Sequence, residues 1–122
     1  SYATIVLPRP HKLTSSADFK TAMKQGVRAG SRTLMVHVYP RPDEVITGGP
    51  RFGLVVSKQV GNAVTRHAVS RKLRHVVVQR GVVDRLPRNY DVVIRALPKS
   101  ATATSDDLAR DMERAITKAL NR

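Results

Sequence analysis

The chain has 122 residues, 41% of them hydrophobic, a length and composition that fit a single domain spanning residues 1–122. It contains 22 Lys or Arg against 9 Asp or Glu and no Cys, which excludes disulfides and thiolate metal sites and leaves a formal net charge of +13. Nucleic acid is the leading partner class for such a charge, because neither a clear membrane-binding amphipathic helix nor a lipidation motif is evident.

The chain begins with residues 1–10, SYATIVLPRP, where Pro8 and Pro10 interrupt a short apolar run. This run is too short for a signal-peptide core or a membrane span, so we expect a flexible tail and a cytoplasmic protein. A capping box at residues 15–18 then predicts a helix that continues to about residue 25 and ends at Gly26.

Two strands are predicted next. Residues 33–39 have apolar side chains at every second position, so one face of this strand is expected to join the core. Residues 40–50 are rich in Pro and Gly and should form a loop, which we expect to be mobile. Residues 52–58 alternate again, and small residues on one face, Gly53 among them, leave room for a close neighbour.

A long helix, a strand and a last helix complete the predicted elements. Asn62 is a good N-cap for a helix that runs to about Arg80 and is ended by Gly81. Residues 90–97 are rich in β-branched side chains and predict a strand. Ser105 is expected to cap the last helix, whose first-turn acids suit the helix dipole. Helices packed over one small sheet make this an α+β domain.

The central helix concentrates positive charge. No Asp or Glu occurs between Glu44 and Asp84, whereas seven Lys or Arg fall in this window. On a helical wheel at about 100° per residue, three arginines share one face with a histidine and a serine. The residues of this face are Arg66, His67, Ser70, Arg71 and Arg74.

An apolar stripe on the same helix would point the arginines away from the sheet. It consists of Val69, Leu73, Val76 and Val77 and lies roughly 120° from the arginines. The planar guanidinium suits phosphate, and the free amides at the helix start add to the same region. A solvated helix face is the plain alternative, but solvated faces usually mix charges of both signs.

No self-sufficient catalytic or metal site is evident. The four His lack metal-ligand spacing, and the acids near the start of the last helix suit its dipole better than Mg²⁺. A nucleophile with an adjacent base cannot be found. We therefore predict no catalytic residue, no protein metal site and no protein-bound cofactor.

Residues 51–74 read RFGLVVSKQVGNAVTRHAVSRKLR. This run closely resembles RxGxxVSKxxGNAVxRNxxKRxxR, the signature of the bacterial ribonuclease P protein subunit. The chain departs from it at His67, where the family usually has Asn, and at Ser70, where it has Lys. An early Asp18-Phe19 pair and the late strand and helix extend the resemblance to about residues 9–120.

The resemblance implies a fold like the second domain of a small-subunit ribosomal protein. This fold is a small mixed sheet of about four strands with three helices in the order αβββαβα, with a left-handed βαβ crossover. The resemblance also implies a protein that binds the catalytic RNA of ribonuclease P and the 5′ leader of precursor tRNA, as a non-catalytic component of an endoribonuclease that matures tRNA. Mg²⁺ and the chemistry would belong to the RNA, and the protein would be monomeric apart from it.

By the same resemblance, two sets of residues would contact RNA. The set expected against the RNA subunit is Lys58, Asn62, Arg66, His67, Arg71, Lys72 and Arg74. The set expected against the leader lies in a cleft between the first helix, the sheet and the central helix, and comprises Phe19, Met23, Met35, His37, Val56 and Lys58. The family often has aromatic residues where Met23 and His37 stand, so we expect weaker base stacking here.

A generic or ribosomal-type RNA-binding protein without an associated enzyme is the alternative. Both hypotheses predict a steep salt dependence of RNA affinity. They differ in whether the protein restores leader removal by ribonuclease P RNA at low Mg²⁺.

Overall fold

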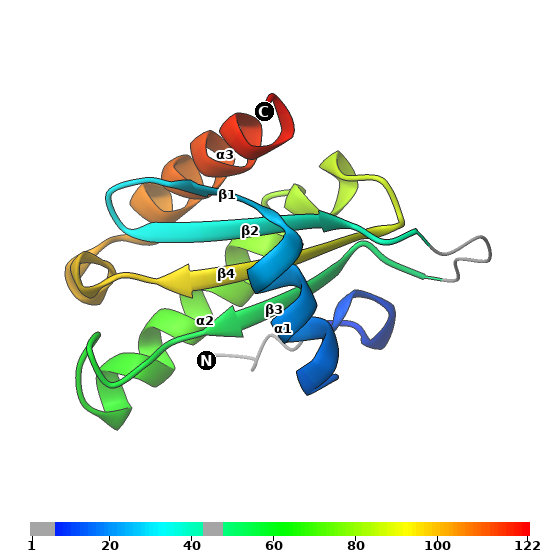
Figure 1. The fold of residues 1–122 in the computed structure, drawn as a ribbon. Coiled ribbons are helices and arrows are strands. Elements are labelled where there is room, and N and C mark those ends of the chain that lie inside the picture. Colours follow the sequence, from blue (N-terminus) through cyan, green and yellow to red (C-terminus); the bar gives the residue numbers. More distant parts are fainter. Residues whose placement is uncertain (1–6, 43–47) are drawn as a thin grey trace.

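The structure, a computed structural model, describes residues 7–42 and 48–122. Within them, three α-helices and four strands follow one another in the expected order αβββαβα (Figure 1). Their bounds are α1 Ser16–Gln25, β1 Val27–Gly30, β2 Leu34–Pro40, β3 Arg51–Val55, α2 Ala63–Gln79, β4 Tyr90–Ala96 and α3 Ser105–Leu120. Short 3-10 helices are η1 Arg9–His11, η2 Val82–Arg85 and η3 Pro98–Thr102.

The strands form one mixed sheet in the order β1-β2-β4-β3. The pairs β1–β2 and β2–β4 are antiparallel, whereas β3 and β4 are parallel. In Figure 1, β3 and β4 both run to the left, β4 lies above β3, and α2 connects them behind the sheet. This connection is a left-handed crossover, the rare hand for such a unit. The expected fold class is confirmed.

The main core lies between α2, α3 and one face of the sheet. β2 contributes the apolar residues Leu34, Val36 and Val38, which are at most 2% exposed. α3 buries Leu108 and Met112, one helical turn apart, against the same cluster. Burial of side chains of this size contributes roughly 1.5–3 kcal/mol each, so this face fixes the positions of both helices.

α1 crosses the opposite face of the sheet (Figure 1). It packs Ala22 and the half-buried Phe19 against a small cluster with Leu13 and Val93. A Cβ atom at Gly53 would collide with the Phe19 ring, so the predicted close approach at this strand is confirmed. Because α1 is short, it covers only part of this face of the sheet, and the rest of the face is not covered by a helix.

Several element boundaries differ from the predictions. The alternation pattern did not locate β1, because this strand has only four residues and begins directly after Gly26. β3 ends at Val55, three residues before its predicted end, so residues 56–58 lie in the turn before α2. The last helix is capped by Thr104 and not by Ser105, since Thr104 exchanges both capping bonds with Asp107.

The N-terminal segment packs against the domain from residue 7 onward, although a tail through residue 10 was expected. Leu7 is 6% exposed and belongs to the main core, and residues 9–11 form η1. The rest of the expected tail, residues 1–6, lies outside the described residues, as does the part of the expected mobile loop at residues 43–47. Among the described helices, none combines the length and apolarity needed to cross a membrane.

Candidate nucleic-acid interface

The start of α2 is fixed by a side-chain cap. The Oδ1 of Asn62 accepts a hydrogen bond from the Thr65 amide at 2.9 Å, as the sequence predicts for an N-cap. Val60 is buried and anchors the preceding turn, while Lys58 and Asn62 are exposed. The first turn of α2 therefore presents free amides and the positive end of the helix dipole beside an exposed ammonium.

The basic face of α2 is turned away from the core. Val69, Leu73, Val76 and Val77 are the buried residues of this helix, which confirms the predicted stripe. On the other side, His67 and Arg71 are exposed and Arg66 and Arg74 are half-buried. Arg66 forms no ion pair with any described residue, and its Nε is buried without a hydrogen-bond partner there. We call Arg66, His67, Arg71 and Arg74 the α2 face.

Lys72 does not join the α2 face. Its Nζ donates a hydrogen bond to the carbonyl of Ala103 at 3.0 Å, and the side chain is half-buried. The arginine face predicted from the helical wheel did not include Lys72, although the family resemblance implied a contact of Lys72 with the RNA subunit. In the structure it ties α2 to the segment between η3 and α3, so it positions the helix.

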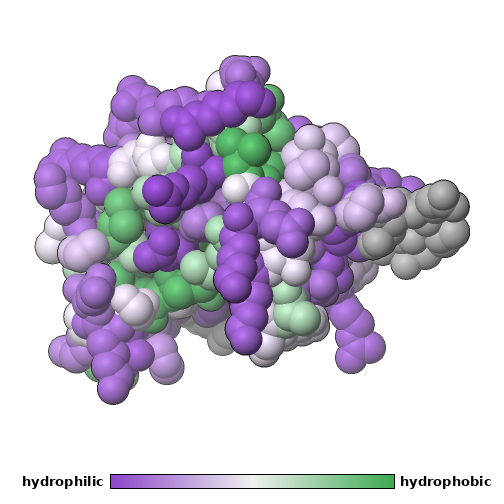
Figure 2. Space-filling model, viewed as in Figure 1, coloured by the Kyte–Doolittle hydropathy of each residue, from purple (hydrophilic) through white to green (hydrophobic). Residues whose placement is uncertain are grey.

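The second candidate surface is the part of the sheet that faces α1. Strand register places Arg28, His37, Val93 and Gly53 in one row across β1, β2, β4 and β3. The next row across the same four strands consists of Gly30, Met35, Arg95 and Val55. Figure 2 views the molecule from this side and shows apolar patches between hydrophilic side chains.

The structure brings together only some of the residues expected against the leader. Met23 is 36% exposed on α1, and Phe19 and Met35 are half-buried on the same side of the sheet. Val56 lies elsewhere: it packs against the main core on the opposite face of the sheet. Lys58 stands in the turn before α2, after the strand has ended.

His37 lies on the expected face but is only 3% exposed. Neither ring nitrogen has a hydrogen-bond partner among the described residues. Burial lowers the pKa of His37 below its ordinary value, and the nearby charges of Arg95 and Arg28 lower it further, while the Met23 backbone weakly opposes this shift. The ring is therefore neutral near pH 7 and is not open for a base to stack on.

Two cations on this face were missed from the sequence. Arg28 is exposed on β1 and Arg95 is half-buried on β4, and neither forms an ion pair with any described residue. Arg28 pairs in register with His37, and Arg95 with Met35. Only the pairing of the strands shows that Arg28 and Arg95 lie on this face, because residues 28 and 95 are far apart in the chain. We call Met23, Arg28, Met35, Val55 and Arg95 the sheet face.

The first arginine of the family signature has a structural role. Arg51 donates two hydrogen bonds to the carboxylate of Asp91, at 2.7 and 2.6 Å, and Asp91 is 1% exposed. Arg41 lies 3.3 Å from the same carboxylate, and Asp18 lies 3.3 Å from Arg51. The hydrogen bonds that Arg51 donates to Asp91 raise the pKa of Arg51 above its ordinary value. Ser15 caps α1 by accepting from the Asp18 amide, but the Asp18 carboxylate pairs with Arg51 instead of closing a capping box.

Among the described residues, the acidic and histidine side chains do not gather into a metal site. Within residues 7–42 and 48–122, no group of three or more His, Asp or Glu is placed to hold a metal ion. The surfaces described above offer cations, amides and apolar side chains, which are chemically suited to nucleic acid.

Comparison with known sequences shows which proteins this chain resembles. The family model described as Ribonuclease P matches residues 7–120. The ribonuclease P protein component of Corynebacterium diphtheriae is 50% identical over 120 residues, covering 96% of this chain and 98% of that protein. The ribonuclease P protein component of Rhodococcus opacus is 52% identical over 110 residues, covering 88% of this chain and 86% of that protein.

Solved structures share the fold. The ribonuclease P protein of Staphylococcus aureus superposes with a TM-score of 0.73 at 24% identity, covering 89% of this chain and 94% of that one. The protein from Thermotoga maritima superposes with a TM-score of 0.67 at 19% identity, covering 85% and 93%. From the family match and the identities to its relatives, this chain belongs to the ribonuclease P protein family.

Proposed function

We propose that this protein serves ribonuclease P as an RNA-binding component with two separate surfaces. The α2 face, with Lys58 and Asn62, grips the catalytic RNA subunit, and the sheet face receives the 5′ leader of precursor tRNA. Hydrolysis of the phosphodiester and the Mg²⁺ that assists it belong to the RNA subunit. The protein acts as one copy without a protein partner and holds no cofactor of its own.

One observation carries this proposal: a cationic helix face and a half-covered sheet face lie on different sides of one rigid core. The guanidinium groups of the α2 face suit phosphates of a folded RNA, since each can make paired, charge-assisted hydrogen bonds. The sheet face combines two cations with Met23, Met35 and Val55. Cations that follow a backbone, with apolar side chains beneath the bases, are typical of sites for single strands.

Cleavage of precursor tRNA by bacterial ribonuclease P RNA at low Mg²⁺, with and without this protein, tests the function. We expect the protein to restore removal of the leader, because its cations replace part of the charge neutralisation that Mg²⁺ otherwise supplies. No stimulation, together with equally tight binding to unrelated RNAs, would favour a generic RNA-binding protein instead.

Charge-removing variants separate the two surfaces. Arg71→Gln should weaken assembly with the RNA subunit. It should also lower the salt slope, the steepness with which log affinity falls with log salt concentration, by about 0.7 to 0.9. Arg95→Gln should leave assembly unchanged and reduce the preference of the holoenzyme for precursor over mature tRNA. Binding measured with the RNA subunit alone, and then with both tRNAs, gives the two readouts. If both variants change both readouts to the same extent, the two-surface arrangement is wrong.

A further inference from the structure

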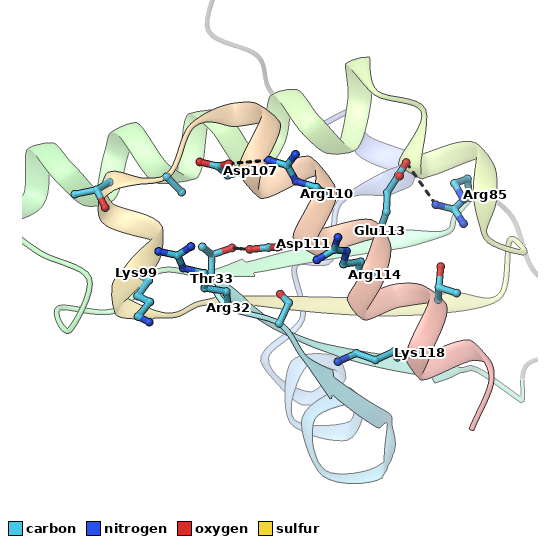
Figure 3. Close-up of a pocket in the computed structure, with 14 residues that line it drawn as sticks. Arg32, Thr33, Arg85, Lys99, Asp107, Arg110, Asp111, Glu113, Arg114 and Lys118 are labelled. Atoms are coloured by element: carbon cyan, nitrogen blue, oxygen red, sulfur yellow. Dashed lines mark hydrogen bonds and ion pairs between the residues drawn. The ribbon is translucent and has the colours of Figure 1, made fainter.

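A third basic region lies apart from both surfaces. It is a polar groove of about 810 Å³ between the turn that joins β1 to β2, the η3 helix and the outer side of α3 (Figure 3). Six basic and three acidic side chains line it. The basic ones are Arg32, Arg85, Lys99, Arg110, Arg114 and Lys118.

The acidic side chains of the groove are already engaged. Asp107 accepts from Arg110 at 2.9 Å and from the Thr104 amide at 3.0 Å, and the hydrogen bonds to Thr104 lower the pKa of this carboxyl below its ordinary value. Glu113 lies 3.5 Å from Arg85. Asp111 accepts from the Thr33 hydroxyl at 2.5 Å (Figure 3).

Three cations of the groove have no such partner. Arg32, Lys99 and Arg114 are exposed, and none forms a hydrogen bond or ion pair with any other described side chain. They come from three different elements, and Figure 3 shows Arg32 and Lys99 beside Thr33 and Arg114 beside Asp111. Unneutralised charges from three different elements make the groove attractive to an anion that carries several charges.

We propose that this groove binds the sugar–phosphate backbone of the RNA subunit, at a point separate from the α2 face. This inference rests on the proposed function. Cations spread along an open groove match the repeating charges of a nucleic-acid strand, and the hydroxyls of Thr102 and Thr117, which also line it, can bond phosphate or ribose oxygens. The bond from Lys72 to Ala103 ties α2 to the η3 end of the groove, so one folded RNA can engage both.

A triple variant, Arg32→Gln, Lys99→Gln and Arg114→Gln, tests the groove in the reconstituted holoenzyme. The matched control is Arg9→Gln, Lys12→Gln and Lys20→Gln, which removes the same charge from exposed side chains that belong neither to the groove nor to the α2 face. The groove variant should lower the salt slope for the RNA subunit by about 2 to 3, since each lost phosphate contact lowers it by about 0.7 to 0.9. The control should change it by less than about 1. Thermal unfolding of each free variant checks that the fold is retained.

Hydroxyl-radical footprinting of the RNA subunit supplies a second readout. Arg114→Gln alone should expose one backbone segment that Arg71→Gln leaves protected. The preference for precursor over mature tRNA should stay at its original value, which separates this proposal from the leader site. An unchanged footprint and slope, an effect equal to that of the control, or a loss confined to precursor tRNA would each overturn it. So would saturable binding of inorganic phosphate that the triple variant abolishes without any change in RNA affinity.

Discussion

At the scale of single residues, His37 couples the stability of this fold to pH. It is 3% exposed, and burial together with Arg95 and Arg28 lowers its pKa, so the folded state binds fewer protons than the unfolded state below about pH 6.5. The stabilisation due to neutral His37 is present above that pH and is lost as pH falls through the folded pKa.

We therefore expect the free energy of unfolding to decrease between pH 7.5 and 5.5, by up to about 1.4 kcal/mol per pH unit from this residue. His37→Gln should flatten the decrease. His67→Gln, which changes an exposed histidine, serves as the control and should leave the slope as it is. Denaturant titrations at several pH values measure the free energy of unfolding of each variant. An identical slope for His37→Gln and the original chain would contradict the assignment.

Asp91 is the other residue on which the fold depends. Asp91 is 1% exposed, and its carboxylate neutralises Arg51 and Arg41 near the start of β4. Asp91→Asn removes the buried charge that Arg51 and Arg41 share, leaving Arg51 the more exposed Asp18, and should cost about 3 kcal/mol, whereas Glu113→Gln, in an exposed pair with Arg85, should cost less than about 1 kcal/mol. Chemical denaturation compares the two, and equal costs would argue against a structural role for the Asp91 cluster.

At the scale of elements, Asn62 has two roles in α2: its side chain caps the helix, and it belongs to the surface that is proposed to bind RNA. Asn62→Ala removes the cap on the Thr65 amide and should reduce stability by about 1 kcal/mol. Asn62→Asp keeps a capping oxygen, and its negative charge interacts favourably with the positive end of the helix dipole. The same charge stands on the protein surface that is proposed to bind RNA, where it repels phosphate.

The two variants should therefore separate stability from binding. We expect Asn62→Asp to fold with stability close to that of the original chain and to bind the RNA subunit more weakly than Asn62→Ala does. Thermal unfolding and RNA affinity, measured on the same samples, decide the point. If Asn62→Asp bound RNA as tightly as the original chain, the first turn of α2 would lie outside the interface.

At the scale of the whole molecule, the net charge of +13 acts on folding and on binding in opposite directions. Repulsion among like charges destabilises the compact state, and salt screens it over a Debye length of about 10 Å at 0.1 M. The free protein should thus unfold at higher temperature as NaCl rises from about 0.02 to 0.3 M, while its affinity for the RNA subunit falls over the same range.

Thermal unfolding and RNA binding, measured across one series of NaCl concentrations, test these opposite effects of salt. Sodium chloride and sodium sulfate at equal ionic strength provide the control, because a difference between them reports effects of the anion itself beyond charge screening. A melting temperature that falls with added NaCl would mean that ion pairs such as the Asp91 cluster outweigh the repulsion.

Much of this protein was readable from its sequence, because the decisive patterns are local. The apolar stripe of α2 needs only a period of 3.6, the cap at Asn62 needs only a neighbouring amide, and the run of residues 51–74 identifies the family by itself. The close approach at Gly53 also followed from residue size alone.

Only the tertiary structure showed the positions of side chains that depend on contacts between distant segments. β1 is too short for its own pattern to reveal it, so Arg28 and Arg95 could not be placed beside Met35 until the strands were in register. Only the packing of the helices showed that the side of β3 shared by Phe52, Leu54 and Val56 is the core side. Lys72 bonds to Ala103 because η3 lies beside α2. The groove along α3 likewise exists only where three separate elements meet, since no stretch of chain contains its free cations together.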